Sequence, residues 1–121
     1  MKCLVVDDNE EITHAILTFF ETKNHSCRVI NDGKDALEVI KNEDFDLILL
    51  DLAMPVFSGY DIIDELEASN MLRPKNIVVI TASQPNEPKH KKILEQGIKD
   101  ILFKPISLER LKELVNTFNP Q

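Results

Sequence analysis

Short apolar runs alternate with longer amphipathic segments along the whole chain, and this alternation limits the fold more than any other feature. Five runs have the length and apolar content of buried strands: residues 3–6, 27–30, 47–50, 77–80 and 101–103. Each is followed by a segment whose apolar side chains recur at helical spacing. Alternating strands and helices with short connections imply right-handed crossovers and a parallel sheet. The pattern predicts an α/β protein with a doubly wound five-stranded parallel sheet, flavodoxin-like strand order 2-1-3-4-5, and helices on both faces.

Capping and turn residues mark the ends of the predicted helices. Asn9 and Ser107 are suitable N-caps for the first and last helices. Residues 31–33, Asn-Asp-Gly, provide a turn between the second strand and the second helix. We expect the third helix to begin at Asp61 and the fourth to end at Gly97.

The fourth and fifth helices differ in their apolar content. The fourth carries little beyond Ile93 and Leu94 and follows a proline-spaced loop at residues 83–88, so we expect it to be the most weakly packed helix. The last helix has five apolar side chains that we expect to face the core: Leu108, Leu111, Leu114, Val115 and Phe118.

Length and charge exclude several classes of protein. A chain of 121 residues fits one compact domain, which we assign to residues 1–121. With 21 acidic and 14 basic residues the formal net charge is -7, which disfavours direct binding to nucleic-acid phosphates. No apolar run reaches the roughly 18 residues that span a bilayer, and acids interrupt the N-terminal run before it resembles a signal peptide. The sequence predicts a cytoplasmic protein with no membrane attachment.

The two cysteines, Cys3 and Cys27, lie in predicted strands. They lack the short spacing of a metal pair or a redox motif, so we expect free, buried thiols. Their proximity on neighbouring strands stays open at this point.

Polar residues close four of the five predicted strands: Asp7 and Asp8 the first, Asp51 the third, Thr81 the fourth and Lys104 the fifth. Because the carboxyl ends of parallel strands form one edge of the sheet, we expect these side chains to converge there. Neighbouring carboxylates repel by roughly 4 kcal/mol per close pair at an effective dielectric of about 20, so the site requires a cation or raised pKa values. An open site with two or three carboxylates suits Mg²⁺ better than Ca²⁺.

The same residue types suit phosphoryl transfer. Mg²⁺ and Lys104 would neutralise phosphoryl oxygens, Thr81 would donate a hydrogen bond to one of them, and Asp51 would act as the nucleophile.

The ordered motifs strongly resemble the receiver domain of two-component response regulators, the CheY-like family, over essentially the whole chain. The resemblance is carried by Asp7-Asp8, residues 51–55 followed by Gly59, Thr81-Ala82 and Lys104-Pro105. It implies that Asp51 is the phosphoacceptor. The phosphoryl donor would be a phosphohistidine on a sensor histidine kinase or a histidine phosphotransfer protein.

The resemblance also implies a Mg²⁺ ion, with Mn²⁺ as the alternative. Asp8 and Asp51 would ligate it directly together with the backbone carbonyl of Ala53, and Asp7 would act through water. Ala53 and Ser83 occupy positions that in this family modulate attack by water on the phosphorylated form.

Phosphoryl-binding and switch roles fall, by the same resemblance, on Thr81, Ala82 and Lys104. Thr81 would move to meet a phosphoryl oxygen, and Lys104 would pair with the acyl phosphate. The peptide bond between Lys104 and Pro105 would be cis.

One position departs from the family pattern. Receivers usually carry Tyr or Phe three residues before the lysine, and this chain has Ile101 there. An isoleucine has no ring to swing inward, so we expect coupling to run through Thr81 and the loop at residues 83–88. Phe103 lies on the same strand face and would replace the ring only if the strand is repositioned.

The leading hypothesis is a phosphorylation switch that alters protein binding through the surface formed by the fourth helix, the fifth strand and the fifth helix. The downstream protein is unknown. One alternative is a phosphorylation-independent interaction module. Another is a Mg²⁺-dependent phosphohydrolase that forms an aspartyl phosphate. The phosphohydrolase is disfavoured because Ala53 stands where such enzymes carry a second acid. We therefore expect no enzyme activity beyond the protein's own phosphorylation and dephosphorylation.

The three histidines lack partners at metal-ligand spacing. We expect His14, His25 and His90 to lie on the surface without a functional role. The basic run at residues 89–92 predicts a solvated helix face, with part of a partner surface as the alternative.

Overall fold

The computed structural model describes residues 1–120, so the expected domain boundary at Gln121 lies outside the described residues. Its sheet has five strands in the order β2-β1-β3-β4-β5, and all four neighbouring pairs are parallel. The strands are β1 (Lys2–Val6), β2 (Ser26–Ile30), β3 (Leu47–Asp51), β4 (Ile77–Thr81) and β5 (Asp100–Phe103). The predicted fold class and strand order are confirmed.

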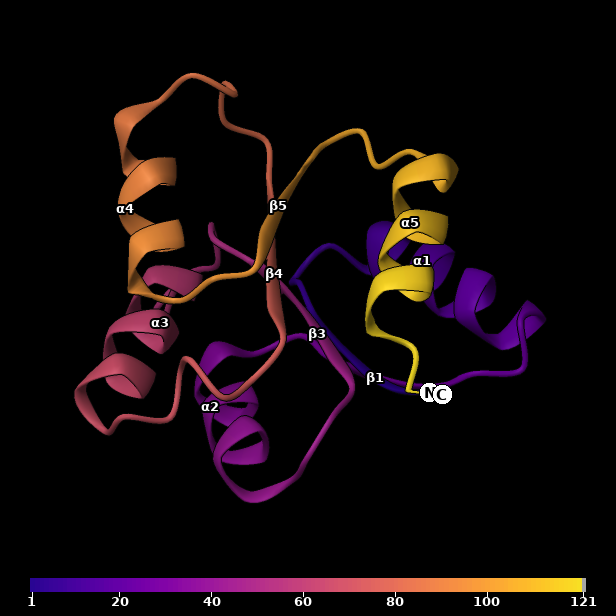
Figure 1. Ribbon diagram of the computed structural model, residues 1–121, viewed down its shortest axis with the longest axis horizontal. Helices are drawn as coiled ribbons and strands as arrows, with labels where there is room; N and C mark the ends of the chain where they lie inside the picture. Colours follow the sequence, from indigo (N-terminus) through magenta and orange to yellow (C-terminus); the bar gives the residue numbers. More distant parts are fainter. Residues whose placement is uncertain (121) are drawn as a thin grey trace.

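Five helices cover the two faces of this sheet (Figure 1). They are α1 (Glu10–Thr22), α2 (Gly33–Asn42), α3 (Gly59–Ala68), α4 (Pro88–Gln96) and α5 (Leu108–Phe118). Helices α1 and α5 pack on one face through Ile16, Phe20 and Leu114, among others. Helices α2, α3 and α4 pack on the other face, where α4 contributes Ile93 as its buried apolar residue. Because all strands are parallel, their carboxyl ends lie at one edge of the sheet and their amino ends at the opposite edge.

Helix caps explain where the elements begin. The Asn9 side chain accepts hydrogen bonds from the first turn of α1, and Ser107 accepts one from Arg110 N, as expected. The third helix begins at Gly59, two residues before the predicted start at Asp61. The reason is a capping box, in which the Ser58 hydroxyl accepts from Asp61 N and the Asp61 carboxylate accepts from Ser58 N.

The predicted turn at residues 31–33 connects β2 to α2, except that its last residue, Gly33, already belongs to the helix. Asp32 is the N-cap, and its carboxylate accepts a hydrogen bond from Asp35 N. Gly33 is the first helical residue and is buried. Glycine is required there because a Cβ would lie 2.0 Å from the carbonyl oxygen of Phe57.

Burial corrects one expectation for the last helix. Leu111 and Leu114 are buried as predicted, whereas Leu108 is 61% exposed. Leu108 follows the N-cap directly and lines an open groove between α1 and α5, so its side chain does not reach the core.

The cysteines lie opposite each other on β1 and β2, where Cys3 pairs with Cys27 in the strand register. Both are free thiols, Cys3 buried and Cys27 half-buried. Burial raises the pKa of each thiol to about 12, which makes both poor nucleophiles. None of the helices within residues 1–120 is long and apolar enough to cross a membrane.

Candidate functional site

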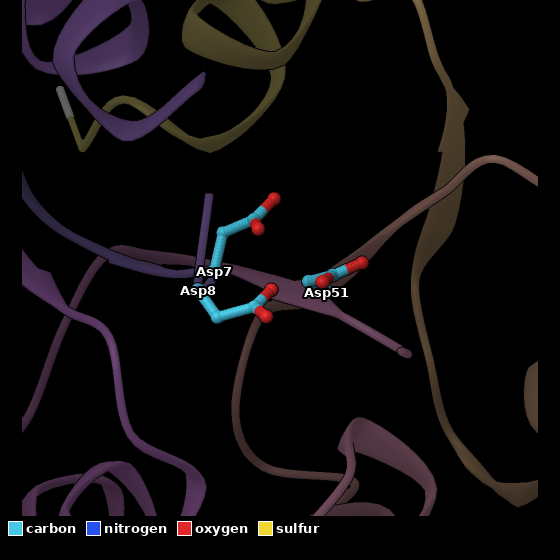
Figure 2. A group of neighbouring side chains, drawn as sticks. All are labelled: Asp7, Asp8 and Asp51. Atoms are coloured by element: carbon cyan, nitrogen blue, oxygen red, sulfur yellow. The ribbon is translucent and has the colours of Figure 1, made fainter. Parts of the chain in front are cut away.

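Three acids meet at the carboxyl edge of the sheet. Asp7 and Asp8 follow β1 directly, and Asp51 is the last residue of the neighbouring strand β3. Each offers a carboxylate oxygen within 4.8 Å of those of the other two (Figure 2). Asp7 and Asp51 are buried, whereas Asp8 is exposed. The structure therefore brings together the three acids that the sequence placed at one rim.

The backbone around Asp51 is held by close packing. Strand β3 is buried along its whole length, and Asp51 pairs with Ile80 in the register with β4. Gly59, the first residue of α3, sits against it, since a Cβ at this position would lie 2.2 Å from the Asp51 carbonyl oxygen. Gly59 N also donates to the carbonyl of Leu52 at 3.0 Å. Only glycine allows this approach, so the start of α3 fixes the position of Asp51.

Lys104 links the buried acids. Its Nζ lies 3.1 Å from Oδ2 of Asp7 and 3.5 Å from Oδ1 of Asp51. The other oxygen of Asp7, Oδ1, accepts a hydrogen bond from Asn9 N at 2.9 Å. The backbone N–H of Lys104 donates to the carbonyl of Thr81 at 2.8 Å, and the peptide bond to Pro105 is cis. The ammonium group is thus placed between the ends of β1 and β3.

One ammonium does not neutralise this cluster. Burial raises the pKa of Asp51 to about 6, and the neighbouring Asp7 carboxylate acts in the same direction. The Lys104 ammonium and the backbone N–H of Ala53 oppose this rise. Ionised Asp51 is therefore less stable than an ordinary aspartate, and added positive charge would stabilise it.

A hard divalent cation fits the donor set. Among the described residues, Oδ2 of Asp7 is buried and accepts no hydrogen bond, although it lies near the Lys104 ammonium. Asp7, Asp8 and Asp51 together provide carboxylate oxygens within 4.8 Å of one another, and Asp8 is open to water. Carboxylates with access to water are the ligands that Mg²⁺ prefers.

Thr81 ends β4, is buried, and is engaged with the loop that follows it. Its Oγ1 lies 2.5 Å from Oγ of Ser83 and accepts a hydrogen bond from Ser83 N at 3.1 Å. Among the hydrogen bonds of residues 1–120, none joins the Thr81 hydroxyl to Asp51. Ala82, the next residue, is exposed at the same rim.

The expectation that His90 lies on the surface is wrong. Its side chain is only 4% exposed, with Nε2 3.0 Å from Oγ of Ser83 and Nδ1 3.2 Å from the carbonyl of Pro85. The imidazole also packs edge-on against Phe103, with 5.3 Å between the ring centroids. His14 is exposed as expected, and His25 is half-buried beside the N-terminal amine.

The physical reason for this error is helix geometry. His90 lies three residues before Ile93, on the inward face of α4, whereas its basic neighbours Lys89, Lys91 and Lys92 are exposed. In the sequence, the three-residue spacing between His90 and Ile93 indicates that both lie on the inward face of the helix. The lysines confirm the prediction of a solvated face for the rest of this run.

Ile101 is buried in β5 and packs in the same cluster as Ile93. Phe103, two residues on, is partly buried against that cluster and faces His90. The aromatic ring on this strand therefore contacts α4.

A family model described as the response regulator receiver domain matches residues 3–116. The chain belongs to this family, the receiver domains of two-component systems, in which phosphorylation operates a signalling switch. The family binds Mg²⁺ at an acidic pocket, and its members are generally signalling switches rather than metabolic enzymes.

Relatives of known role agree with this assignment. The sensor histidine kinase RcsC of Salmonella typhi is 30% identical over 118 residues, which are 98% of this chain and 12% of that protein. The response regulator SaeR of Staphylococcus aureus is 31% identical over 115 residues, which are 93% of this chain and 48% of that protein. The chain thus spans less than half the length of these curated relatives.

Among solved structures, the receiver domain of the Francisella response regulator 1452 superimposes with a TM-score of 0.83 at 31% identity. The alignment covers 97% of this chain and 94% of that one.

Proposed function

We propose that Asp51 is the phosphoacceptor of this receiver domain. The observation that carries the proposal is the convergence of Asp7, Asp8, Asp51 and Lys104 at one edge of the sheet. We further propose that Mg²⁺, or Mn²⁺ in its place, binds there through Asp8, Asp51 and the backbone carbonyl of Ala53, with Asp7 acting through water. The buried Oδ2 of Asp7, which has an ion-pair contact with Lys104 but accepts no hydrogen bond among the described residues, supports further positive charge at this position.

Asp51 attacks as a carboxylate, and its raised pKa of about 6 means that this ionised form is destabilised by burial and by Asp7. The ion supplies positive charge that favours the carboxylate and neutralises phosphoryl oxygens. An oxygen of Asp51 then forms a bond to phosphorus as the bond from phosphorus to the donor histidine nitrogen breaks, and that nitrogen keeps the electron pair. Lys104, already within 3.5 Å of Asp51, pairs with the new phosphoryl group.

Thr81 and Ala82 complete the proposed phosphoryl site at the end of β4. The Thr81 hydroxyl would turn from Ser83 to donate a hydrogen bond to a phosphoryl oxygen. Ala82 is small and exposed beside it, which leaves room for the group. The protein would catalyse only its own phosphorylation and dephosphorylation.

The donor would be a histidine kinase or a histidine phosphotransfer protein. A groove of about 630 Å³ lies between α1 and the start of α5, lined mainly by apolar side chains such as Ile12, Ile16 and Ile106. Lys104 lines the same groove and also contacts Asp51. A donor helix seated in this groove would bring its phosphohistidine next to the acceptor.

The output surface would be α4, β5 and α5. Few apolar contacts hold α4, since Ile93 is its buried apolar residue, and an element with few core contacts is easily displaced. We also propose that residues 1–121 form one domain, because both core clusters pack on a single sheet. The cytoplasmic location and the absence of nucleic-acid binding stay predictions.

Incubation with acetyl phosphate and Mg²⁺, followed by intact mass measurement, tests the proposal. We expect a mass increase of one phosphoryl group that disappears in Asp51→Asn and in the presence of EDTA. Asp44→Asn, an exposed acid outside the site, is the matched control and should retain the adduct. Complete absence of an adduct would favour the interaction module. Phosphate release from many small phosphomonoesters would favour the phosphohydrolase.

A further inference from the structure

A partly buried chain of polar groups connects the end of β4 to helix α4. It runs from the Thr81 hydroxyl to the Ser83 hydroxyl at 2.5 Å, and from there to Nε2 of His90 at 3.0 Å. It ends where Nδ1 of His90 meets the carbonyl oxygen of Pro85 at 3.2 Å. Thr81 and His90 are each 4% exposed, so water has little access to these two side chains, and Ser83 between them is half-buried. The proposed acceptor chemistry does not use His90.

The donors and acceptors along this chain fix the direction of each hydrogen bond. The carbonyl of Pro85 can only accept, so Nδ1 of His90 carries a proton. In the uncharged imidazole, Nε2 is then an acceptor, and the Ser83 hydroxyl must donate to it. A hydroxyl has one proton, so Ser83 has none left for Thr81. The hydrogen bond between the two hydroxyls is therefore donated by Thr81.

This order occupies the one hydroxyl proton of Thr81. Its Oγ1 accepts from Ser83 N and donates to Ser83 Oγ. A phosphoryl oxygen on Asp51 is itself only an acceptor. The Thr81 hydroxyl can therefore donate to it only after breaking the hydrogen bond that it donates to Ser83 Oγ. His90 thus acts on Thr81 without touching it.

We propose that His90 is a positioning residue that, through Ser83, keeps the Thr81 hydroxyl proton directed away from Asp51 in the unphosphorylated protein. This role rests on the proposed function, in which Thr81 binds the phosphoryl group. It also gives the acceptor site a direct link to α4 in a chain where Ile101 replaces the usual aromatic residue. When Thr81 turns to the phosphoryl group, Ser83 and the first turn of α4 lose that tether.

Affinity for beryllofluoride, a tetrahedral analogue of the phosphoryl group, tests the proposal in the presence of Mg²⁺. Ser83→Ala removes the acceptor for the Thr81 proton. His90→Leu keeps an apolar side chain against Phe103 but frees the Ser83 hydroxyl to donate to Thr81. Because one hydrogen bond no longer has to be broken, we expect both variants to bind beryllofluoride roughly 2- to 10-fold more tightly than the unmodified protein.

Two controls separate positioning from packing. His90→Gln retains an amide oxygen that can accept from Ser83 and an amide N–H that can donate to Pro85, so its affinity should return towards that of the unmodified protein. Ser69→Ala removes a hydroxyl at the end of α3, far along the chain from this site, and should leave the affinity unchanged.

The ¹⁵N chemical shifts of the His90 ring provide a second readout that needs no ligand. We expect a protonated Nδ1 and an accepting Nε2, with the Nε2 signal shifted in Ser83→Ala. A protonated Nε2 with an unprotonated Nδ1 would overturn the proposal, as would unchanged beryllofluoride affinity in both Ser83→Ala and His90→Leu. Failure of the unmodified protein to bind beryllofluoride with Mg²⁺ would instead contradict the proposed function, and with it the role given to Thr81.

Discussion

The two halves of the carboxyl edge differ in how their polar groups are satisfied. The acidic half, formed by Asp7, Asp8 and Asp51, holds three carboxylates near a single ammonium, and a buried oxygen of Asp7 accepts no hydrogen bond among the described residues. The hydroxyl half, Thr81 and Ser83 with His90, contains no carboxylate, and each of its side chains has a hydrogen-bond partner.

This difference indicates which half favours phosphorylation and which opposes it. The acidic half gains when positive charge arrives, because its carboxylates repel one another without it. The hydroxyl half is already satisfied, and under our proposal it would have to give up a hydrogen bond for Thr81 to bind a phosphoryl group. The resting state is thus stabilised mainly on the β4–α4 side and destabilised on the β1–β3 side.

Asp8→Ala should give the largest effect on Mg²⁺ binding, and it acts on the acidic half alone. Loss of an outer-shell partner typically weakens metal binding by roughly 10- to 100-fold. Asp8 is a proposed direct ligand, so we expect its loss to weaken Mg²⁺ binding by roughly 100-fold, the upper end of that range. Titration calorimetry with MgCl₂ measures this. Asp44→Ala changes the net charge equally and should leave the affinity within about 2-fold, since an exposed distant charge is screened. Equal losses in both variants would show that Mg²⁺ binds to the general acidic surface.

Lys104→Ala should destabilise the metal-free protein. It removes the ammonium beside two buried carboxylates, which costs about 3 kcal/mol when charges are left unpaired in a mostly buried site. Urea unfolding in EDTA measures this loss, and saturating Mg²⁺ should recover part of it. Lys112→Ala, which breaks only an exposed pair with Glu109, is the control and should change little. An equal effect of both variants would contradict the charge balance described for the acidic half.

Asp51→Asn should stabilise the metal-free protein at neutral pH. The folded-state pKa of Asp51 is about 6, above the ordinary aspartate value of 3.8, so the folded protein binds this proton more tightly than the unfolded chain. The ionised carboxylate therefore lowers stability progressively as pH rises from about 4 to about 6, and fully above that. We expect a gain on the order of 2 kcal/mol at pH 7 and almost none at pH 4.

Thermal unfolding of both proteins at the two pH values, in EDTA, measures this difference. A gain that is the same at both pH values would assign the effect to packing rather than to charge.

Ser83→Ala should give the smallest effect, and it is confined to the hydroxyl half. Loss of its hydroxyl removes neutral hydrogen bonds worth about 1 kcal/mol. Amide hydrogen exchange should quicken in the first turn of α4 and stay unchanged in α1 and α2. Quickened exchange throughout the sheet would mean that the hydroxyl chain supports the whole fold rather than α4.

The acidic half could be predicted from the sequence because its residues lie at, or within two residues of, the carboxyl end of a buried strand. Parallel strands carry such residues to one edge, whatever the loops do. The hydroxyl half could not be predicted in the same way, because His90 lies among lysines and only its spacing from Ile93 reveals an inward position. Leu108 shows the opposite error, since helical spacing placed it inward and the open groove beside it leaves it exposed.

Lys104 belongs to both halves of the edge. Its backbone N–H donates a hydrogen bond to the carbonyl of Thr81, while its ammonium lies beside Asp7 and Asp51. Substitutions at Thr81 and at Asp51 therefore share a neighbour, and their effects on stability should not be additive. A double-mutant cycle with substitutions at Thr81 and Asp51 would measure the coupling free energy between the two halves of the edge.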